Sequence, residues 1–174
     1  MRELETAVVI VLDDARPELE PVRAEFHAGS VAIGIPLHVT LLYPFAPPAQ
    51  VDEEALEEFF GQFDGFTLTL TRLAAWPLVV YAVPEPRTQL LAMMHALFEK
   101  YPEYPPYEGE IAEPEPHVTL SELEPGESLE EVAAGIRART VSLFPLTCEV
   151  RDVALLEEYE PDRWRDRRRF PLCA

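Results

Sequence analysis

The sequence has little cysteine, few basic residues and no long apolar run. The cysteines number two, Cys148 and Cys173, too few for a disulfide scaffold. Lysine and arginine total 14 against 32 acidic residues, a formal net charge of −18, which argues against broad binding to DNA or RNA backbones. The apolar stretch Ala7 to Leu12 is far too short to span a membrane. Since the first residues also lack a signal-peptide pattern, we expect a soluble, cytoplasmic protein without membrane contacts.

A repeated tetrapeptide is the most informative feature that is present. His-Val-Thr-Leu occurs as His38 to Leu41 and again as His117 to Leu120, once in each half of the 174-residue chain. Both copies lie in β-branched, apolar segments typical of strands. Side chains alternate between the faces of a strand, so each histidine shares its face with the threonine two residues later. The sequence therefore predicts two imidazole and hydroxyl pairs that could meet in one site.

The predicted elements follow the same order in both halves. The first half predicts strand, helix, strand, helix and strand at Ala7–Leu12, Pro17–His27, Leu37–Tyr43, Asp52–Phe60 and Phe66–Leu73. The second half predicts the same series at Leu78–Val83, Thr88–Tyr101, His117–Leu123, Leu129–Arg137 and Cys148–Leu156. A last strand is expected at about 163–172. We interpret the order as an internal duplication, with units of about 5–75 and 76–158, inside one two-lobed domain that spans residues 1–174.

Two histidines beside two hydroxyls suit acid–base chemistry at a phosphate. Histidine can both accept and donate a proton near neutral pH, and a positioned pair can act as base and acid. His38 and His117 are therefore the candidate catalytic residues. The hydroxyls of Thr40 and Thr119 could donate hydrogen bonds to the phosphate oxygens. This scheme requires no metal and no cofactor. A zinc site at the two histidines is the alternative, although no His-Glu-x-x-His or cysteine pair supports it.

These residues resemble the hallmark of the two-histidine phosphoesterase superfamily, which includes 2'-5' RNA ligase-like proteins and cyclic phosphodiesterases. Its two motifs have the form His-x-Thr/Ser-x-hydrophobic, matched here by His38, Thr40 and Leu42, and by His117 and Thr119. The resemblance implies an α+β, bilobed fold in which two antiparallel sheets with flanking helices enclose a cleft. It also implies metal-independent action on 2',3'-cyclic phosphates or 2'-5' linkages. The chain departs from the pattern at polar Ser121. It also lacks the Phe-Leu-Gly sequence that commonly follows the first motif in ligase-like members.

We therefore expect a monomeric phosphodiesterase that acts on a small nucleotide or an RNA terminus with a cyclic phosphate. Two alternatives remain at this stage: 2'-5' RNA ligation, and a non-catalytic module that binds nucleotides or RNA ends in the same cleft. The sequence does not assign the acid and the base between the two histidines.

Other segments have two interpretations each. The arginines between Arg163 and Arg169, with Trp164 among them, could bind phosphate and stack a base, but a charged edge strand paired with the acidic surface is favoured. The segment Tyr101 to Pro116, rich in proline and glutamate, is either a loop over the cleft or a solvated connector. Tyr43 is excluded from the site by its strand parity. His27 and His95, without a threonine companion, are expected to be structural or surface residues.

Overall fold

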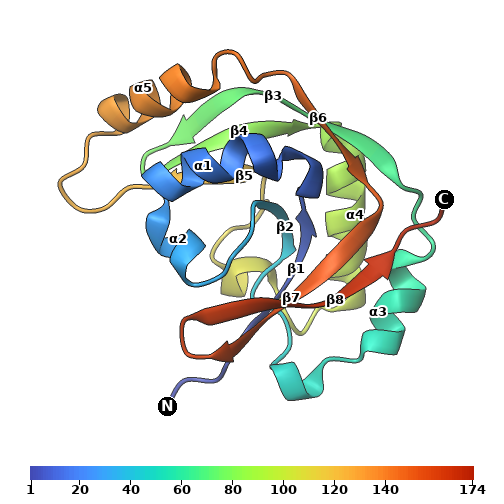
Figure 1. Ribbon diagram of the computed structural model, residues 1–174. Coiled ribbons are helices and arrows are strands. Elements are labelled where there is room, and N and C mark those ends of the chain that lie inside the picture. Colours follow the sequence, from blue (N-terminus) through green and yellow to red (C-terminus); the bar gives the residue numbers. More distant parts are fainter.

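The computed structural model describes all residues, 1–174, and contains two four-stranded antiparallel sheets (Figure 1). The first sheet has the order β2-β1-β7-β8 and the second the order β5-β4-β3-β6. The strands of the first are β2 (His38–Leu42), β1 (Thr6–Val11), β7 (Asp152–Glu160) and β8 (Arg163–Pro171). Those of the second are β5 (Val118–Glu122), β4 (Val79–Glu85), β3 (Phe66–Trp76) and β6 (Leu146–Val150). The expected α+β fold with two antiparallel sheets is confirmed.

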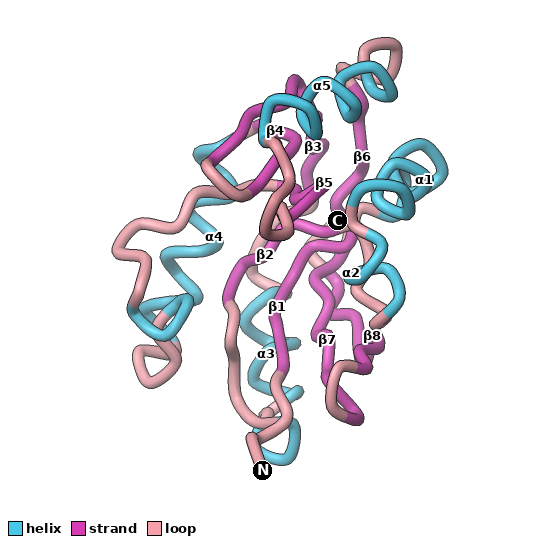
Figure 2. The backbone as a smooth tube through the Cα atoms, turned by 90° about the vertical axis from the view of Figure 1, so that its left-hand side faces the viewer, coloured by secondary structure: helices cyan, strands magenta, loops and turns pink.

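Five helices flank the sheets. They are α1 (Arg16–Phe26), α2 (Ala28–Ala32), α3 (Glu53–Phe60), α4 (Arg87–Lys100) and α5 (Leu129–Thr140). In Figure 2 the two sheets lie one above the other, with α4 on one side of the molecule and α1 on the other. Local sequence sets the helix starts: the Asp52 carboxylate accepts a hydrogen bond from the Ala55 amide at 3.1 Å, and the Ser128 hydroxyl accepts one from Glu131 at 3.3 Å. None of the helices is both long and apolar enough to cross a membrane.

The two halves of the sequence exchange strands. β3, from the first half, lies between β4 and β6, whereas β7, from the second half, lies between β1 and β8. The helices follow the same exchange, because α1 packs against β5 and α4 packs against β2. One apolar cluster of 31 buried residues includes Val8 and Ile10 of β1 together with Leu68 and Leu70 of β3. The two sheets therefore share one continuous core.

One predicted strand is wrong. The segment Cys148–Leu156 is two strands rather than one: β6 pairs with β3 in one sheet, and β7 pairs with β1 and β8 in the other. The chain passes between the sheets at Arg151, the single residue between β6 and β7. Both segments are extended and apolar, so a period-two pattern runs through the crossing without a visible break.

The strands that carry the two histidines occupy matching places. β2 is an edge strand of the first sheet and β5 an edge strand of the second. These two edges contact each other where the sheets meet. The fold thereby brings the two His-Val-Thr-Leu segments to one junction.

Candidate active site

Each histidine strand contains one extra residue directly after the threonine. In β2, Thr40 pairs with Val9 and Leu42 with the adjacent Val8, so Leu41 has no partner. The same irregularity occurs in β5, where Leu120 is the unpaired residue between Thr119 and Ser121. Both are β-bulges, which shift the alternation of the strand by one residue. Before the bulge, histidine and threonine share a face, as the sequence predicts.

The imidazole of His38 is held at both nitrogens. Nδ1 donates a hydrogen bond to the Pro36 carbonyl oxygen at 2.7 Å. Because a carbonyl can only accept, the neutral ring carries its proton on Nδ1 and leaves Nε2 as an acceptor. The Thr40 hydroxyl lies 3.1 Å from Nε2 and donates to it. The ring therefore presents a basic nitrogen beside a hydroxyl.

His117 is anchored in the same way. Its Nδ1 donates to the carbonyl oxygen of Glu115 at 2.7 Å, again two residues before the histidine. Two aromatic rings surround it: Trp76 lies edge-on with centroids 4.7 Å apart, and Tyr81 lies at 5.8 Å. These rings restrict the orientation of the imidazole. Both histidines thus have Nδ1 bound to backbone and Nε2 left as an acceptor when neutral.

A pocket of about 510 Å³ contains the whole predicted set. His38, Thr40, His117 and Thr119 all line it. His38 and Thr40 lie on the edge strand β2 and Thr119 on the edge strand β5, and His117 directly precedes the first residue of β5. The structure therefore brings together the four residues that the repeated motif singled out.

Burial lowers the basicity of both histidines. It lowers the pKa of His38 to about 4, against the opposing effect of the hydrogen bond to Pro36. Burial also lowers the pKa of His117, opposed by the Glu115 carbonyl and by the carboxylates of Glu122 and Glu115. Both rings are therefore neutral at pH 7 in the empty pocket, and a bound anion would raise both pKa values.

Tyr43 lines the pocket, so its exclusion on strand parity is wrong. The bulge at Leu41 reverses the alternation, and Leu41 and Leu42 are both buried. Tyr43 consequently returns to the histidine face, where its hydroxyl donates to Glu5. Glu122 follows the second bulge in the same way and also lines the pocket.

Ser121, the polar departure in the second motif, faces away from the pocket. Its side chain is buried, and its hydroxyl donates to the Phe26 carbonyl oxygen at the end of α1, at 2.8 Å. One of the carbonyls left unpaired at a helix C-terminus is satisfied in this way. The departure from the motif is therefore an interaction with α1 and leaves the pocket unchanged.

The segment Tyr101 to Pro116 folds back to the pocket. Its Tyr107, in the short 3₁₀ helix Pro106–Gly109, lines the pocket, and the Tyr107 amide donates to the Tyr43 carbonyl at 2.7 Å. Burial raises the pKa of the Tyr107 phenol, and its interaction with the Thr40 hydroxyl acts in the opposite direction. Tyr107 and Glu108 have φ values of 51° and 56°, a strained conformation for non-glycine residues. Of the two interpretations of this segment, the loop over the cleft fits the structure.

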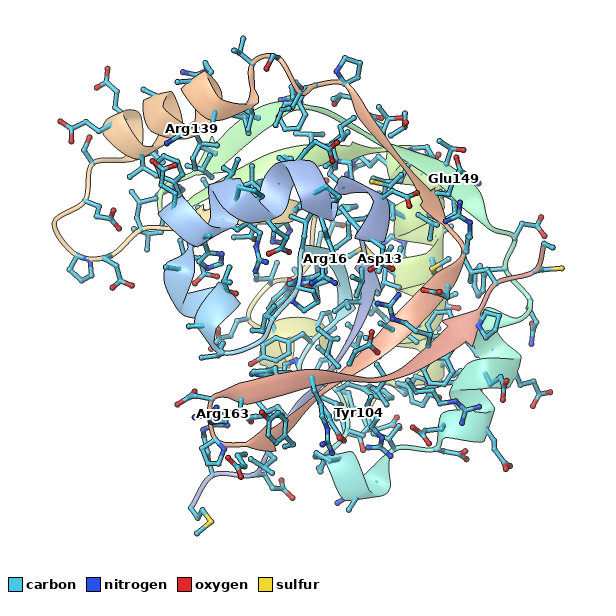
Figure 3. All side chains as sticks on the ribbon, viewed as in Figure 1. Asp13, Arg16, Tyr104, Arg139, Glu149 and Arg163 are labelled. Carbon is cyan, nitrogen blue, oxygen red and sulfur yellow. The ribbon has the colours of Figure 1, made fainter.

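The arginines of β8 point to acidic partners instead of the pocket. The pairs are Arg165 with Glu157 at 2.8 Å, Arg167 with Glu53 at 3.0 Å, Arg168 with Glu57 at 2.8 Å and Arg169 with Asp13 at 2.9 Å. Arg163, at the end of the β7–β8 hairpin in Figure 3, lies 3.7 Å from Glu160. The favoured interpretation, pairing with the acidic surface, is confirmed. Trp164 differs from them, because it lines the pocket and packs against Tyr43 with centroids 6.3 Å apart.

The other two histidines have different surroundings. His95 is exposed on α4, as expected. His27 lies between α1 and α2 and lines the pocket, with its Nδ1 buried and unpartnered. Its place near the site comes from the contact of α1 with β5, which no local pattern reveals. No three His, Cys, Asp or Glu side chains are grouped so as to hold a metal ion.

Comparison with known proteins gives the family. A model of the 2'-5' RNA ligase superfamily matches residues 11–162. The chain belongs to this superfamily. No curated protein sequence matches it.

Solved structures resemble this superfamily member over their full length. A crystal structure described as a phosphoesterase has a TM-score of 0.63 at 21% identity and covers 99% of this chain and 100% of its own. E. coli LigT complexed with 3'-AMP has a TM-score of 0.62 at 21% identity, with coverage of 99% and 100%. The protein TT0787 of Thermus thermophilus has a TM-score of 0.56 at 20% identity, with coverage of 98% and 97%. At these identities the likeness establishes the fold.

Proposed function

We propose that this protein is a metal-independent phosphodiesterase that opens 2',3'-cyclic phosphates on small nucleotides or RNA ends. The observation that carries the proposal is the matched orientation of the two imidazoles. In each motif a backbone carbonyl two residues earlier fixes the proton on Nδ1, so that Nε2 is the nitrogen left for proton transfer; in His38 it accepts from Thr40 while the pocket is empty. Membership of the superfamily supports the same reaction class.

In this mechanism, one neutral imidazole removes a proton from water as the water oxygen attacks phosphorus. The other, protonated, imidazole donates its proton to the 2' or 3' oxygen as the bond from phosphorus to that oxygen breaks. The product is a nucleoside monophosphate, and the pair of histidines has exchanged protonation states. Each positioned histidine contributes roughly 10²–10⁴-fold. Thr119, and Thr40 once its hydroxyl turns from His38 Nε2 to the substrate, donate hydrogen bonds to the non-bridging oxygens, where negative charge increases in the transition state.

The phosphate itself assists protonation of the acid. Both histidines have lowered pKa values in the empty pocket. An anionic phosphate between them favours the imidazolium form and raises those values. LigT in complex with 3'-AMP, a nucleoside monophosphate, supports a ligand of this size.

The test is hydrolysis of 2',3'-cyclic nucleoside monophosphates by EDTA-treated protein. We expect turnover that falls at least about 100-fold in both His38→Ala and His117→Ala. His95→Ala is the matched control, because His95 is exposed on α4 and outside the pocket. The product, a 2'- or 3'-phosphate, identifies the leaving oxygen. Binding without turnover of cyclic nucleotides, RNA ends and 2'-5' linkages would contradict the proposal and indicate a binding module.

A further inference from the structure

The pocket that would receive the phosphate has acidic walls. Apart from histidine, the charged residues that line it are four carboxylates, Glu5, Glu122, Glu158 and Asp162, and one guanidinium, Arg2. A site that binds several phosphates ordinarily supplies free arginine or lysine side chains. In this pocket, by contrast, carboxylates outnumber cationic side chains.

The guanidinium of Arg2 is already neutralised. It donates to both carboxylate oxygens of Glu158, at 2.8 and 2.5 Å, and lies 3.5 Å from Asp162. Glu158 is buried and also accepts from the amides of Glu5 and Asp162, and these interactions, above all that with Arg2, lower its pKa to about 2. Arg2 is therefore bound within the protein, and its charge is matched by Glu158.

No other cation compensates the pocket. Arg23 lies behind the wall, bonded to Ser30 and Ile35, and its charge lowers the pKa of His38; it is buried, however, and paired with Glu20 at 3.0 Å. Lys100, on α4, lies over the rings of Phe59 and Tyr101 and does not line the pocket. The arginines of β8 are paired with carboxylates as described above.

Glu122, at the end of β5, is a carboxylate of the second sheet that lines the pocket and acts on His117. Its carboxylate has no hydrogen-bond or ion-pair partner, in contrast to Glu5 and Glu158, and it raises the pKa of both His117 and His27. It also lines an adjoining pocket of about 510 Å³ together with Glu25, Glu124 and Glu127. A chain leaving the site on this side would meet further carboxylates. On the side of the β7–β8 hairpin it would meet Asp162.

We propose that this pocket selects phosphodiesters with a single negative charge, and that Glu122 and Asp162 repel any further phosphate on the substrate. The inference rests on the proposed function and narrows it. The preferred substrate class is a nucleoside cyclic monophosphate without a 5'-phosphate, and a phosphorylated RNA end is a poor substrate. A cyclic phosphate has one charge, which the two histidines and the threonines can bind, whereas a 5'-phosphate adds up to two more.

The experiment compares adenosine 2',3'-cyclic phosphate with the same compound carrying a 5'-phosphate. We expect kcat/KM to be at least about tenfold lower for the 5'-phosphorylated compound, with a ratio that shrinks as salt screens the carboxylates. Either Glu122→Gln or Asp162→Asn should relax the ratio about fivefold, as removal of one like-charge contact predicts. Glu130→Gln, an exposed change of equal charge on α5 and outside the pocket, should leave it unchanged.

Equal kcat/KM values for the two compounds would overturn the inference and leave the phosphodiesterase proposal intact. A ratio that neither salt nor either pocket variant alters would also overturn it. If neither compound is hydrolysed, the proposed reaction fails, and calorimetric binding of 3'-AMP against adenosine 3',5'-bisphosphate gives the same comparison of charge. Equal affinities there would contradict the inference, and weaker binding of the bisphosphate would support it.

Discussion

At the scale of single residues, the two histidines are oriented alike, and burial lowers the pKa of each. Acid–base catalysis by such a pair needs one ring neutral and the other protonated at the same time. With both pKa values lowered, the free protein populates that state on the acidic side of neutrality. The state with both rings neutral dominates at pH 7 until an anion enters.

This arrangement predicts an acidic optimum for kcat/KM. The pKa of His38 is about 4, and that of His117 lies below its ordinary value of about 6.5. We expect kcat/KM to fall about tenfold per pH unit above pH 6.5, because the acid is lost from the free protein. The decline of kcat should begin at higher pH, since the bound phosphate raises the pKa of the acid. Initial rates between pH 4.5 and 9 with a cyclic nucleotide measure the pH dependence of kcat and of kcat/KM. A kcat/KM that rises up to pH 8 would contradict the prediction.

Some residues of the pocket can be predicted from the sequence and others cannot. The parity of His38 and Thr40 could be predicted because it depends only on the strand that carries them. The position of Tyr43 could not, because the bulge at Leu41 depends on pairing with β1. His27 and Trp164 come to the pocket through contacts between elements distant in sequence. Local sequence patterns therefore predict the catalytic candidates, whereas most other residues of the pocket wall can be identified only from the three-dimensional structure.

At the scale of elements, the loop from Tyr101 to Pro116 is attached to the first histidine strand. Tyr101 and Tyr104 pack edge-on against Phe45, with centroids 4.9 and 5.3 Å apart, and the Tyr107 amide binds the Tyr43 carbonyl. These contacts hold the strained backbone at Tyr107 and deliver its phenol to the pocket. The loop is thus part of the site wall.

Replacement of Tyr107 by phenylalanine tests the contribution of this loop. We expect the phenol to donate a hydrogen bond to the phosphate beside Thr40, so Tyr107→Phe should lower kcat/KM for a cyclic nucleotide about tenfold, the effect of one hydrogen bond to a charged group. Tyr104→Phe is the matched control, since Tyr104 lies in the same loop but does not line the pocket. Equal losses in the two variants would show that the effect comes from loop packing and not from the Tyr107 hydroxyl.

The turn between α2 and β2 packs directly against the backbone of Trp164, another residue of the pocket wall. Gly34 has φ of +93°, and a Cβ atom there would lie 2.3 Å from the Trp164 carbonyl oxygen. Gly34→Ala should therefore destabilise the protein by about 2–3 kcal/mol and displace Trp164. Gly29 lies in α2 with open space around it, so Gly29→Ala should instead increase the free energy of unfolding by up to ~1 kcal/mol. Urea unfolding followed by tryptophan fluorescence measures the stability of both variants. Equal stabilities of Gly34→Ala and Gly29→Ala would refute the proposed role of this turn.

At the scale of the whole molecule, the exchange of β3 and β7 joins the two halves of the sequence. Each sheet contains strands from both halves, and one buried cluster runs through both sheets. Each predicted repeat unit is one continuous segment of the sequence, whereas each sheet combines strands from both segments. A repeated order of elements fixes which strands exist, but it does not fix their partners, because strand pairing is set by contacts distant in sequence.

The exchange predicts that neither half folds alone and that the halves reassemble together. A break in the turn between Trp76 and Val79 would give fragments 1–77 and 78–174. In the first, β3 would lack both β4 and β6, and β1 would lack β7, so buried residues such as Val9 and Leu68 would be exposed to water. We expect each fragment to lack a cooperative transition in circular dichroism, and their equimolar mixture to recover the signal of the intact chain. The intact chain should unfold in one calorimetric transition with equal calorimetric and van't Hoff enthalpies. A cooperatively folded single fragment would contradict this prediction. Two separate transitions of the intact chain would mean instead that the two sheets unfold as independent units.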